Sequence, residues 1–578
     1  MIVKRLLSTL CLLTIVAGSQ HSLAQTPHPI QVARGVQYQQ TITTGAHPMV
    51  INVLRVNLHD RGVRAFVGQA YGGITSKGTE SGRQTVEDMA ARYHAVAGVN
   101  ADFFPWTGRP LDLAIHNGHL YSFPYAGRPA IGFTRNGTAV IDQLDETCTL
   151  TKDDGTHIHI TGIDEPSALN SAVLYNSYYQ LPVVAHNTGV VITLNCGELS
   201  PTTHERVRVI SAQPMAAGET VAPPLQGRML LLLAGQPAVE AANIGVGDRC
   251  TLTAMLTEHG GSSRRAIWQH VLEAVSGGPW ILRNNKVVPP SLQPGFGLHS
   301  FILYHHPRTA VGITANGDLI LGVVDGRSPL SSGMSLAQLG ELMKQAGAVD
   351  AMNLDGGGSS VMVVRGRVVN MPSDGTSRLV ANSLLISAPT EEQATVHAPL
   401  ALVNPPHSVT AGSTLHLRSS GDPWLWGTSN GRGFVSQTGN FTSYTAGITT
   451  VIAGTGGART KLGLEVVPAA VSHFRASLVM LNAFTSTLTV HAYDRYGNSV
   501  EGVHILVTTQ PALPAATIIT DAHGLAGANI TWPAEQSSSD SVSVSAPGAT
   551  PLVILRSAQK PAPVRPVQPT DPDNNKTP

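Results

Sequence analysis

The chain has 578 residues, which is too long for a single hydrophobic core and predicts roughly three to four domains. Its 37 basic residues balance 37 acidic ones, so the net charge gives no reason to expect nucleic acid or an anionic membrane as a partner. Only 13% of the residues are charged, while there are 58 Gly and 38 Pro, a composition that favours a turn-rich β protein over a coiled coil.

The first segment of the chain is typical of an export signal. Lys4 and Arg5 precede an apolar run over residues 6–16, and the small-x-small triplet that ends at Ala24 provides a cleavage site. The run is shorter than the ~20 residues that a bilayer-spanning helix needs, so we predict a signal peptide at residues 1–24 rather than an anchor. No later segment is long and apolar enough to span a bilayer. We therefore expect an exported protein, in the periplasm or at the cell surface, without a transmembrane segment after cleavage.

Three cysteines remain after the signal, which contains Cys11, has been removed. They are Cys148, Cys196 and Cys250, and an oxidising compartment permits one disulfide among them, although the sequence does not choose the pair. No Cys-x-x-Cys spacing is present, so a cysteine zinc site is not expected.

After an N-terminal segment at residues 25–47, residues 48–390 predict one domain rich in β-hairpins. Asn-Gly pairs lie between apolar or alternating runs, which indicates two-residue turns in which both turn residues have positive φ. Two similar pairs of runs, joined by Asn-Asn and Arg-Gly, predict hairpins as well. The five predicted hairpins cover residues 112–122, 130–142, 279–288, 311–324 and 360–369.

Helical periodicity is sparse in this domain. Apolar residues recur at helical spacing over residues 335–346, with Ser335 as the N-cap and Gly347 as the stop. A weaker helical pattern covers residues 83–95. The fold class that we predict is therefore α+β, with a mainly antiparallel sheet and few helices, followed by all-β modules.

The composition changes beyond Pro389 to Ser-, Thr- and Val-rich sequence with short alternating runs. Residues 396–467 and 470–557 each have the size of a small β-sandwich. Through "AYDRYGNSVEGVHILVTT" and "TDAHGLAGANIT", the second resembles bacterial immunoglobulin-like repeats of the invasin and intimin type, which implies surface or glycan contacts. Residues 558–578 are Pro-rich and cannot bury a core, so we predict a disordered tail.

Two apolar runs of the first domain end in an aspartate followed by glycine. The first ends in Asp325-Gly326-Arg327, and the second ends in Asp355 followed by Gly356, Gly357, Gly358 and Ser359. Consecutive main-chain N–H groups at a strand end form concave anion sites, and glycine lets an anion approach closely. Two tight turns with local Asp hydrogen bonds are the plainer alternative. Nucleotide hydrolysis is disfavoured because the Gly-Lys-Ser/Thr ending of a phosphate loop is absent.

Other segments add groups that suit a sugar phosphate. Arg308 begins an apolar run, and a guanidinium grips a phosphate through two hydrogen bonds. Gly277 and Gly278 offer another close approach, and Asn100 and Asp102 precede aromatic residues. Asn and Asp side chains suit the hydroxyls of a sugar, and aromatic faces suit its ring. Taken singly, an arginine at such a position is more often an ion-pair partner than a ligand.

Six segments together resemble the phosphodiester glycosidase family, in the family's order and across about residues 48–388. The resemblance implies hydrolysis of a sugar-1-phosphodiester at the glycosidic C–O bond, which releases a sugar and a phosphomonoester. One departure stands out: the family commonly shows Asn-Gly-Gly-Tyr/Phe-Phe, whereas this chain has Asn-Ala-Asp-Phe-Phe at 100–104. The six segments are residues 95–104, 174–182, 275–288, 306–328, 333–364 and 369–386.

The resemblance and the residue types lead to a hypothesis for the site. Asp355 is the base or nucleophile, Asp325 is its partner or a metal ligand, and Arg308 and the N–H groups of residues 356–359 bind the phosphate. Asn100 is a further catalytic candidate, which would orient the substrate or the carboxylates. The remaining substrate-binding candidates are Asp102, Gly277, Gly278, Arg327, Asn353, Arg378 and Asn382.

No metal ligands are assigned. Ca²⁺ or Mg²⁺ is compatible with the many oxygen ligands, but no loop has EF-hand spacing and no histidine pair has zinc spacing. Two alternatives stay open: a non-catalytic glycan-binding protein or adhesin of the cell envelope, and a metal-dependent phosphodiesterase that cuts the P–O bond.

Overall fold

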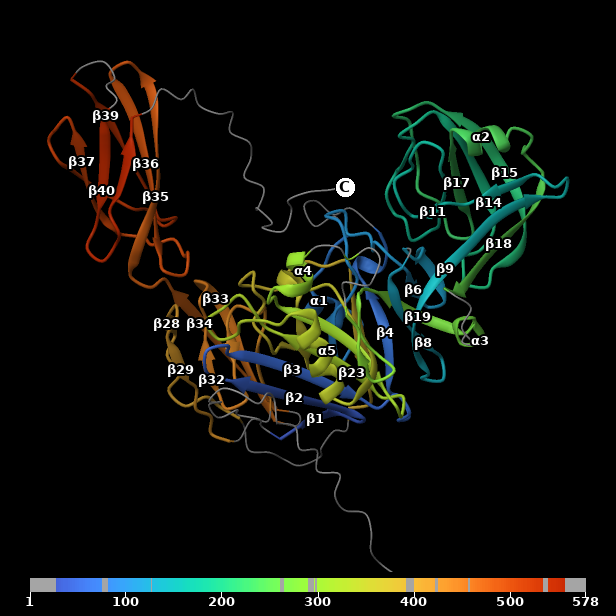
Figure 1. Cartoon of the computed structure of the whole chain (residues 1–578), viewed down its shortest axis with the longest axis horizontal. Helices are drawn as coiled ribbons and strands as arrows, with labels where there is room; N and C mark the ends of the chain where they lie inside the picture. Colours follow the sequence, from blue (N-terminus) through green and yellow to red (C-terminus); the bar gives the residue numbers. More distant parts are fainter. Residues whose placement is uncertain are drawn as a thin grey trace, which may run out of the picture. The chain divides into compact units, whose positions relative to one another are not determined.

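The computed structural model describes residues 28–74, 82–125, 127–259, 265–289, 296, 299–390, 400–421, 425–455, 458–533 and 539–556 (Figure 1). The predicted signal peptide and the predicted disordered tail lie outside these ranges. The chain divides into two compact units. The first contains the described residues up to Pro405 together with 416–441 and 449–463, and the second contains 406–415, 442–448 and the residues from 464 onward. Segment 396–467, predicted as one module, is therefore shared between the units.

The first unit contains an antiparallel sheet that carries both aspartate-glycine turns. Figure 1 shows β2 and β3 in blue beside the yellow-green β23, which lies far away in the sequence. The order is β1 (Ile30–Ala33), β2 (Val36–Thr43), β3 (Met49–Val56), β23 (Leu319–Val324), β22 (Arg308–Thr314), β24 (Ala348–Asn353), β20 (Trp280–Arg283) and β21 (Lys286–Val287). Helix α5 (Leu336–Gln345) buries Leu336, Leu339, Leu342 and Met343 against one face of this sheet.

A second sheet packs against the other face. Its central strands run in the order β30 (Leu425–Thr428), β26 (Arg367–Val368), β25 (Met362–Val364), β5 (Ala97–Asn100), β27 (Asn382–Ser387) and β4 (Arg64–Gln69). One core joins the two sheets, since Val311 and Met352 of the first pack with Val99 and Leu384 of the second. Helix α1 (Val86–Arg92) covers the outer face of the second sheet.

A third sheet of the first unit has its own core. Strand β10 (His157–His159) pairs with β9, and the other strands run β11 (Gly162–Ile163), β12 (Ala172–Tyr175), β17 (Met229–Ala234), β14 (Gly189–Asn195), β15 (His204–Met215), β18 (Arg249–Glu258), β9 (Ala139–Lys152), β8 (Pro129–Thr134), β19 (Val271–Ser276), β6 (Ala114–His116) and β7 (His119–Ser122). Cys148, Cys196 and Cys250 are buried in this core as free thiols. The disulfide that an oxidising compartment permits is therefore not formed among these three residues.

The remaining elements of the first unit are short. They are η1 (Ala70–Gly72), β13 (Val183–Val184), β16 (Thr220–Val221), α2 (Gln236–Glu240), α3 (Arg265–Trp268), α4 (His299–Leu303), η3 (Gly357–Ser359) and β31 (Phe434–Val435). Strands β29 (Thr414–His416), β32 (Asn440–Thr442), β33 (Gly447–Thr455) and β34 (Ala458–Val467) each extend across a boundary between the units.

The second unit contains two sheets that enclose one core. The first has the order β35 (Val471–Asn482), β36 (Thr485–Asp494) and β39 (Leu525–Thr531). The second has the order β38 (Ala516–Ile519), β37 (His504–Gln510), β40 (Ser541–Ser545) and β41 (Leu552–Leu555). Leu488 and Val490 of the first pack with Ile505 and Val544 of the second, so residues 471–555 form a sandwich. The strand β28 (Ser408–Thr410) also belongs to this unit. The immunoglobulin-like assignment stays a prediction.

All five hairpins of the first unit form, but two have a different turn. Both turn residues have positive φ at Asn117-Gly118, Asn284-Asn285 and Arg365-Gly366. At Asn136-Gly137 and Asn316-Gly317 only the glycine does. In the first of these, Thr134 N donates to Thr138 O and Gly137 N donates to Thr134 O, so the loop is longer than predicted. A turn of this length needs one left-handed residue, at its glycine.

The two predicted helices are present. The Ser335 side chain accepts a hydrogen bond from Gln338 N, the Gln338 side chain binds back to Ser335 N, and Gly347 has a φ of 95°. Within the described ranges, no helix is long and apolar enough to cross a bilayer.

Candidate active site

The triple glycine forms a turn at the end of β24 where the main chain passes three neighbours closely. Leu354 N donates to Thr309 O at 2.8 Å and Gly357 N to Pro307 O at 2.9 Å. A Cβ at Gly356 would lie 3.0 Å from Pro307 O, and Gly357 has a φ of 61°. A Cβ at Gly358 would overlap the side chains of Arg378 and Asp374. The sequence therefore has glycine at three consecutive positions because each lacks room or freedom for a side chain.

The N–H groups of this turn are mostly engaged within the protein. Gly356 N donates to Asp355 Oδ1 at 2.9 Å, and Ser359 N donates to Gly356 O at 3.2 Å. Together with the bond from Gly357 to Pro307, these contacts use three of the four donors in residues 356–359. The predicted nest of outward N–H groups is thus largely absent, because nearby oxygens of the turn itself and of Pro307 accept those hydrogens.

Asp355 lies half-buried at the start of the turn. Its main chain is held on both sides, since Asp355 N donates to Ala101 O at 2.9 Å and Asp355 O accepts from Asn100 Nδ2 at 2.6 Å. The Asn100 Oδ1 atom accepts from Thr309 Oγ1 at 2.8 Å and from Val361 N at 3.1 Å. Asn100 is fully buried, so its side chain holds the Asp355 turn from the interior of the protein.

Two guanidinium groups lie over the glycine turn. Arg327 has a φ of 57°, and its Nη2 would lie 3.4 Å from a Cβ at Gly357. The same Nη2 is 3.2 Å from His306 Nδ1. Arg378 Nε donates to Asp374 Oδ2 at 2.7 Å, and Arg378 Nη1 is 3.4 Å from Ser359 Oγ. The structure thus brings both predicted arginines to the turn.

A third cation adjoins Arg378. Burial, and then the charge of Arg378, lower the pKa of Arg83. The Arg83 guanidinium lies 4.7 Å from the ring centroid of Trp106, which is largely exposed. The sequence analysis did not single out Arg83, because one arginine ahead of a helix carries no recognisable signal.

Arg308 does not lie with these cations. It is 1% exposed, Nε donates to Met334 O at 2.9 Å, and Nη2 donates to Phe301 O and Tyr304 O at 2.7 and 3.1 Å. These contacts hold α4 and the segment before α5 against β22. A phosphate would have to compete with three main-chain carbonyls, so the contacts support a structural role.

Asp325 reaches the same sheet edge as Asp355, but its carboxylate is directed elsewhere. Gly326 packs against Pro307, whose carbonyl accepts from the glycine turn. Asp325 itself is 1% exposed, Oδ1 accepts from Asn370 Nδ2 at 2.8 Å, and Oδ2 accepts from Met371 N at 2.9 Å. Burial raises its pKa to about 7, although both hydrogen bonds oppose that shift.

Asn370 connects Asp325 to the glycine turn. Its Nδ2 also donates to Ser360 O at 3.0 Å, and its Oδ1 accepts from Met362 N at 2.8 Å. The sequence analysis missed this residue, because an asparagine in a turn-rich segment has many ordinary roles.

Asp102 is a buried carboxyl group in the segment that follows β5. Its Oδ1 accepts from Ser276 N, its Oδ2 accepts from Asn382 Nδ2, and Asp102 N donates to Asn382 Oδ1 at 3.0 Å. Asp102 is 2% exposed. Burial raises its pKa well above the usual range, and the charges of Asp112 and Asp355 act in the same direction.

The Gly277-Gly278 segment closes another side of the site. A Cβ at Gly277 would lie 2.5 Å from Asn353 O, and Gly278 N donates to the same oxygen at 2.6 Å. Asn353 Nδ2 donates to Gly278 O at 2.9 Å, whereas its buried Oδ1 has no hydrogen-bond partner. Gln69, opposite Asn382 on β4, has a buried Nε2 that also lacks one. Both side chains are fully buried, so neither atom is exposed to solvent.

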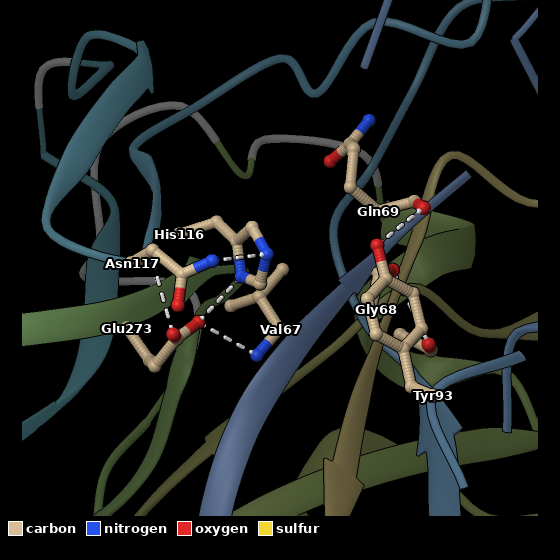
Figure 2. A network of polar contacts seen from close by, with 8 residues as sticks. Val67, Gly68, Gln69, Tyr93, His116, Asn117 and Glu273 are labelled. Carbon is tan, nitrogen blue, oxygen red and sulfur yellow. Dashed lines mark hydrogen bonds and ion pairs between the residues drawn. The ribbon is translucent and has the colours of Figure 1, made fainter. Parts of the chain in front are cut away.

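A polar network fixes the strand that delivers Ser276 and Gly277. Figure 2 shows the Glu273 carboxylate of β19 pointing at both β4 and the β6–β7 turn. Glu273 Oε2 accepts from Val67 N at 2.9 Å and lies 2.9 Å from His116 Nδ1, and Oε1 accepts from Asn117 N at 3.0 Å. Tyr93 OH donates to Gln69 O at 3.2 Å. The sequence analysis missed this network, whose members are distant in the chain.

Asp325 is the one residue that the sequence suggested as a possible metal ligand, and the described part of the chain contains no group of three His, Cys, Asp or Glu side chains arranged to hold a metal ion. The compatibility with Ca²⁺ or Mg²⁺ stays a prediction.

Part of the chain is similar to a known class of protein. Residues 200–387 match the model of the phosphodiester glycosidase family, and this match confirms the resemblance. The matched segment contains β22, β23, β24 and the glycine turn, whereas Asn100 and Asp102 precede it.

Individual relatives are similar over a shorter stretch. The SPbeta prophage-derived uncharacterized protein YomE of Bacillus subtilis is 36% identical over 115 residues, which are 20% of this chain and 17% of that protein. The N-acetylglucosamine-1-phosphodiester alpha-N-acetylglucosaminidase of Mus musculus is 32% identical over 111 residues, which are 18% of this chain and 21% of that enzyme. The match thus spans about a fifth of the length of these relatives.

One solved structure shares the fold. A hypothetical protein from Synechocystis superposes with a TM-score of 0.52 at 18% identity, over 62% of this chain and 63% of that one. At this identity the likeness concerns the fold alone.

Proposed function

We propose that the first unit hydrolyses a sugar-1-phosphodiester at the glycosidic C–O bond and releases a free sugar and a phosphomonoester. The observation that carries this proposal is the half-buried Asp355 carboxylate beside a glycine turn covered by Arg327 and Arg378. A carboxylate next to two cations suits a substrate whose anomeric carbon is bonded to a phosphate. The family match supports the same reaction class.

In this mechanism Asp355 acts at the anomeric carbon. As a base it takes a proton from water while the water oxygen bonds to C1, and as a nucleophile its carboxylate bonds to C1 first and water releases the sugar. In both routes the C1–O bond breaks and its electron pair remains on the phosphate oxygen. The stereochemistry at C1 distinguishes the routes, because one displacement inverts it and two retain it.

Arg327 and Arg378 are the phosphate ligands that we propose, in place of Arg308 and the N–H nest. The leaving phosphomonoester has a second pKa of about 6, so it departs without the strong general acid that a sugar alkoxide requires. The two guanidiniums stabilise the charge that develops on the phosphate as the bond breaks.

The decisive experiment determines which product receives the oxygen atom of water. The full chain is incubated with a sugar-1-phosphodiester in ¹⁸O-water, and both products are analysed by mass spectrometry. We expect the label in the sugar and none in the phosphate. Label in the phosphate would instead establish P–O cleavage, as in a metal-dependent phosphodiesterase. Binding without any product would establish the non-catalytic alternative.

We also propose an exported protein that meets its substrate in the bacterial cell envelope, in the periplasm or at the cell surface. The signal-like residues 1–24 and the sandwich at 471–555 support this proposal. Cleavage after Ala24 is tested by mass determination of the mature N-terminus, and retention of residue 1 would contradict it.

A further inference from the structure

Three arginines meet at the turn that joins β25 to β26. Arg365 and Gly366 form this turn with φ of 50° and 70°, and Arg365 N donates to Val96 O at 2.7 Å. Arg367 follows as the first residue of β26. Arg459 Nη1, from β34, would lie 3.9 Å from a Cβ at Gly366. We call Arg365, Arg367 and Arg459 the arginine cluster, and all three belong to the first unit.

The arginine cluster is separate from the candidate active site. Strand β25 starts close to the glycine turn and ends at Val364. The cluster follows that end, so strand β25 separates it from the glycine turn. Its charges therefore require an explanation that the proposed hydrolysis does not supply.

The deepest member of the cluster is a buried cation. Arg367 is 3% exposed, and one of its donors, Nη1, reaches Arg365 O at 2.9 Å. Its Nε is buried without a hydrogen-bond partner. Arg365 is half-buried, and Arg459 is exposed at the rim. Among the described residues no carboxylate forms an ion pair with any of the three.

The positive charges act on one another. Burial, followed by the charges of Arg459 and Arg365, lowers the pKa of Arg367 to about 9. Burial and the charge of Arg459 also lower the pKa of Arg365. Burying a charged group without a partner costs free energy that an opposite charge would offset. The Arg365-Gly366 turn places Arg365 beside Arg367 at the start of β26, and Arg459 adjoins the same turn.

We propose that the arginine cluster binds a phosphate group, either free or carried by a polymer. A guanidinium donates two parallel hydrogen bonds to a tetrahedral oxyanion. Arg367 supplies the unpartnered Nε at the base, and Arg365 and Arg459 supply charge at the rim. A bound phosphate replaces repulsion between like charges with attraction, so occupancy stabilises the first unit.

The test is thermal unfolding of the full chain in chloride and in phosphate buffers of equal ionic strength. We expect phosphate to raise the melting temperature of the wild type more than that of Arg459→Gln, and in chloride we expect Arg459→Gln to melt higher than the wild type. By equilibrium dialysis, the affinity of this site for inorganic phosphate falls by about tenfold in the variant, as loss of one charged contact of ~1.4 kcal/mol predicts. Arg135→Gln, at an exposed hairpin turn, is the matched control.

A second variant separates this site from the active site. Arg327→Gln removes a proposed phosphate ligand of the active site, and it should keep the phosphate effect of the arginine cluster. The proposal is overturned if phosphate raises the melting temperature equally in the wild type, Arg459→Gln and Arg365→Gln. It is also overturned if only Arg327→Gln loses the rise that phosphate causes. Poly(glycerol phosphate) distinguishes a polymer-borne phosphate from the free ion. If it binds more tightly than inorganic phosphate and this binding is lost in Arg459→Gln, the ligand is a polymer. If it does not bind, the ligand is the free ion.

Discussion

Individual residues of the site divide into those that face a ligand and those that hold the others in place. Asp355 is half-buried beside Arg327 and Arg378, whereas Asn100 and Asp325 are buried and use their polar atoms on neighbouring main-chain and side-chain groups. The sequence does not distinguish a carboxylate or amide that faces a ligand from one that holds other residues in place. Its role depends on which donors the fold places around it.

For Asp355→Asn we expect a loss of activity without a loss of stability. The amide cannot act as base or nucleophile, and removal of a general base typically costs 10²–10⁴-fold in rate. The measurement is kcat on a sugar-1-phosphodiester together with the thermal midpoint. Wild-type kcat in this variant would remove Asp355 from the mechanism.

Asp325 makes the fold sensitive to pH. Its pKa rises from 3.8 to about 7 on folding, so the unfolded chain loses this proton at a lower pH than the folded chain does. The free energy of unfolding therefore falls as the pH rises from about 4 to about 7. The slope is at most about 1.4 kcal/mol per pH unit. Urea unfolding at several pH values should show a weaker decline in Asp325→Asn, which cannot ionise there. An identical decline in both proteins would show that Asp325 does not titrate in this range.

For Gly358→Ala we expect weaker substrate binding. The added methyl group meets the side chains of Arg378 and Asp374, so the guanidinium must leave its position over the turn. We expect kcat/KM to fall by about tenfold or more, the equivalent of ~1.4 kcal/mol. Gly197→Ala, where nothing lies within 4 Å of an added Cβ, is the control and should retain full activity.

At the scale of elements, the best-predicted features are local. The cap of α5 and the left-handed turns depend on residues that are neighbours in the chain, so a short sequence window contains the whole cause. The turns at Gly137 and Gly317 were mispredicted because their neighbours also hydrogen-bond within the loop.

For Ser335→Ala we expect lower stability and unchanged catalysis. The hydroxyl accepts from Gln338 N in the first turn of α5, and loss of such a cap costs about 1 kcal/mol. The measurement is the free energy of unfolding from urea titration, with kcat as the control. Ser335→Asp retains the acceptor and should restore most of the stability.

At the scale of the whole molecule, the site exists only because distant strands end at one place. Gln69, Asp102, Ser276, Asp355 and Asn382 come from five separate segments, and the networks around Glu273 and Asn370 align those segments. The buried thiols belong to the third sheet and take no part in this assembly.

We expect reducing agent to leave the melting temperature unchanged, because Cys148, Cys196 and Cys250 are free and separately buried. A thiol reagent should modify them only after denaturation. A lower melting temperature in dithiothreitol would indicate a disulfide and contradict this expectation.

The sequence by itself determined the β-rich class, the hairpins, the capped helix, the family resemblance and the position of the glycine turn. Each of these depends on local spacing or on a motif that stays contiguous in the chain. Only the tertiary structure decided that Arg327 and Arg378 lie over the turn, that Arg308 and Asp325 hydrogen-bond within the protein, and that Asp102 is buried against Ser276 and Asn382. Those outcomes depend on which buried donors and acceptors meet across distant strands, because each buried polar group must find its partner within the folded chain.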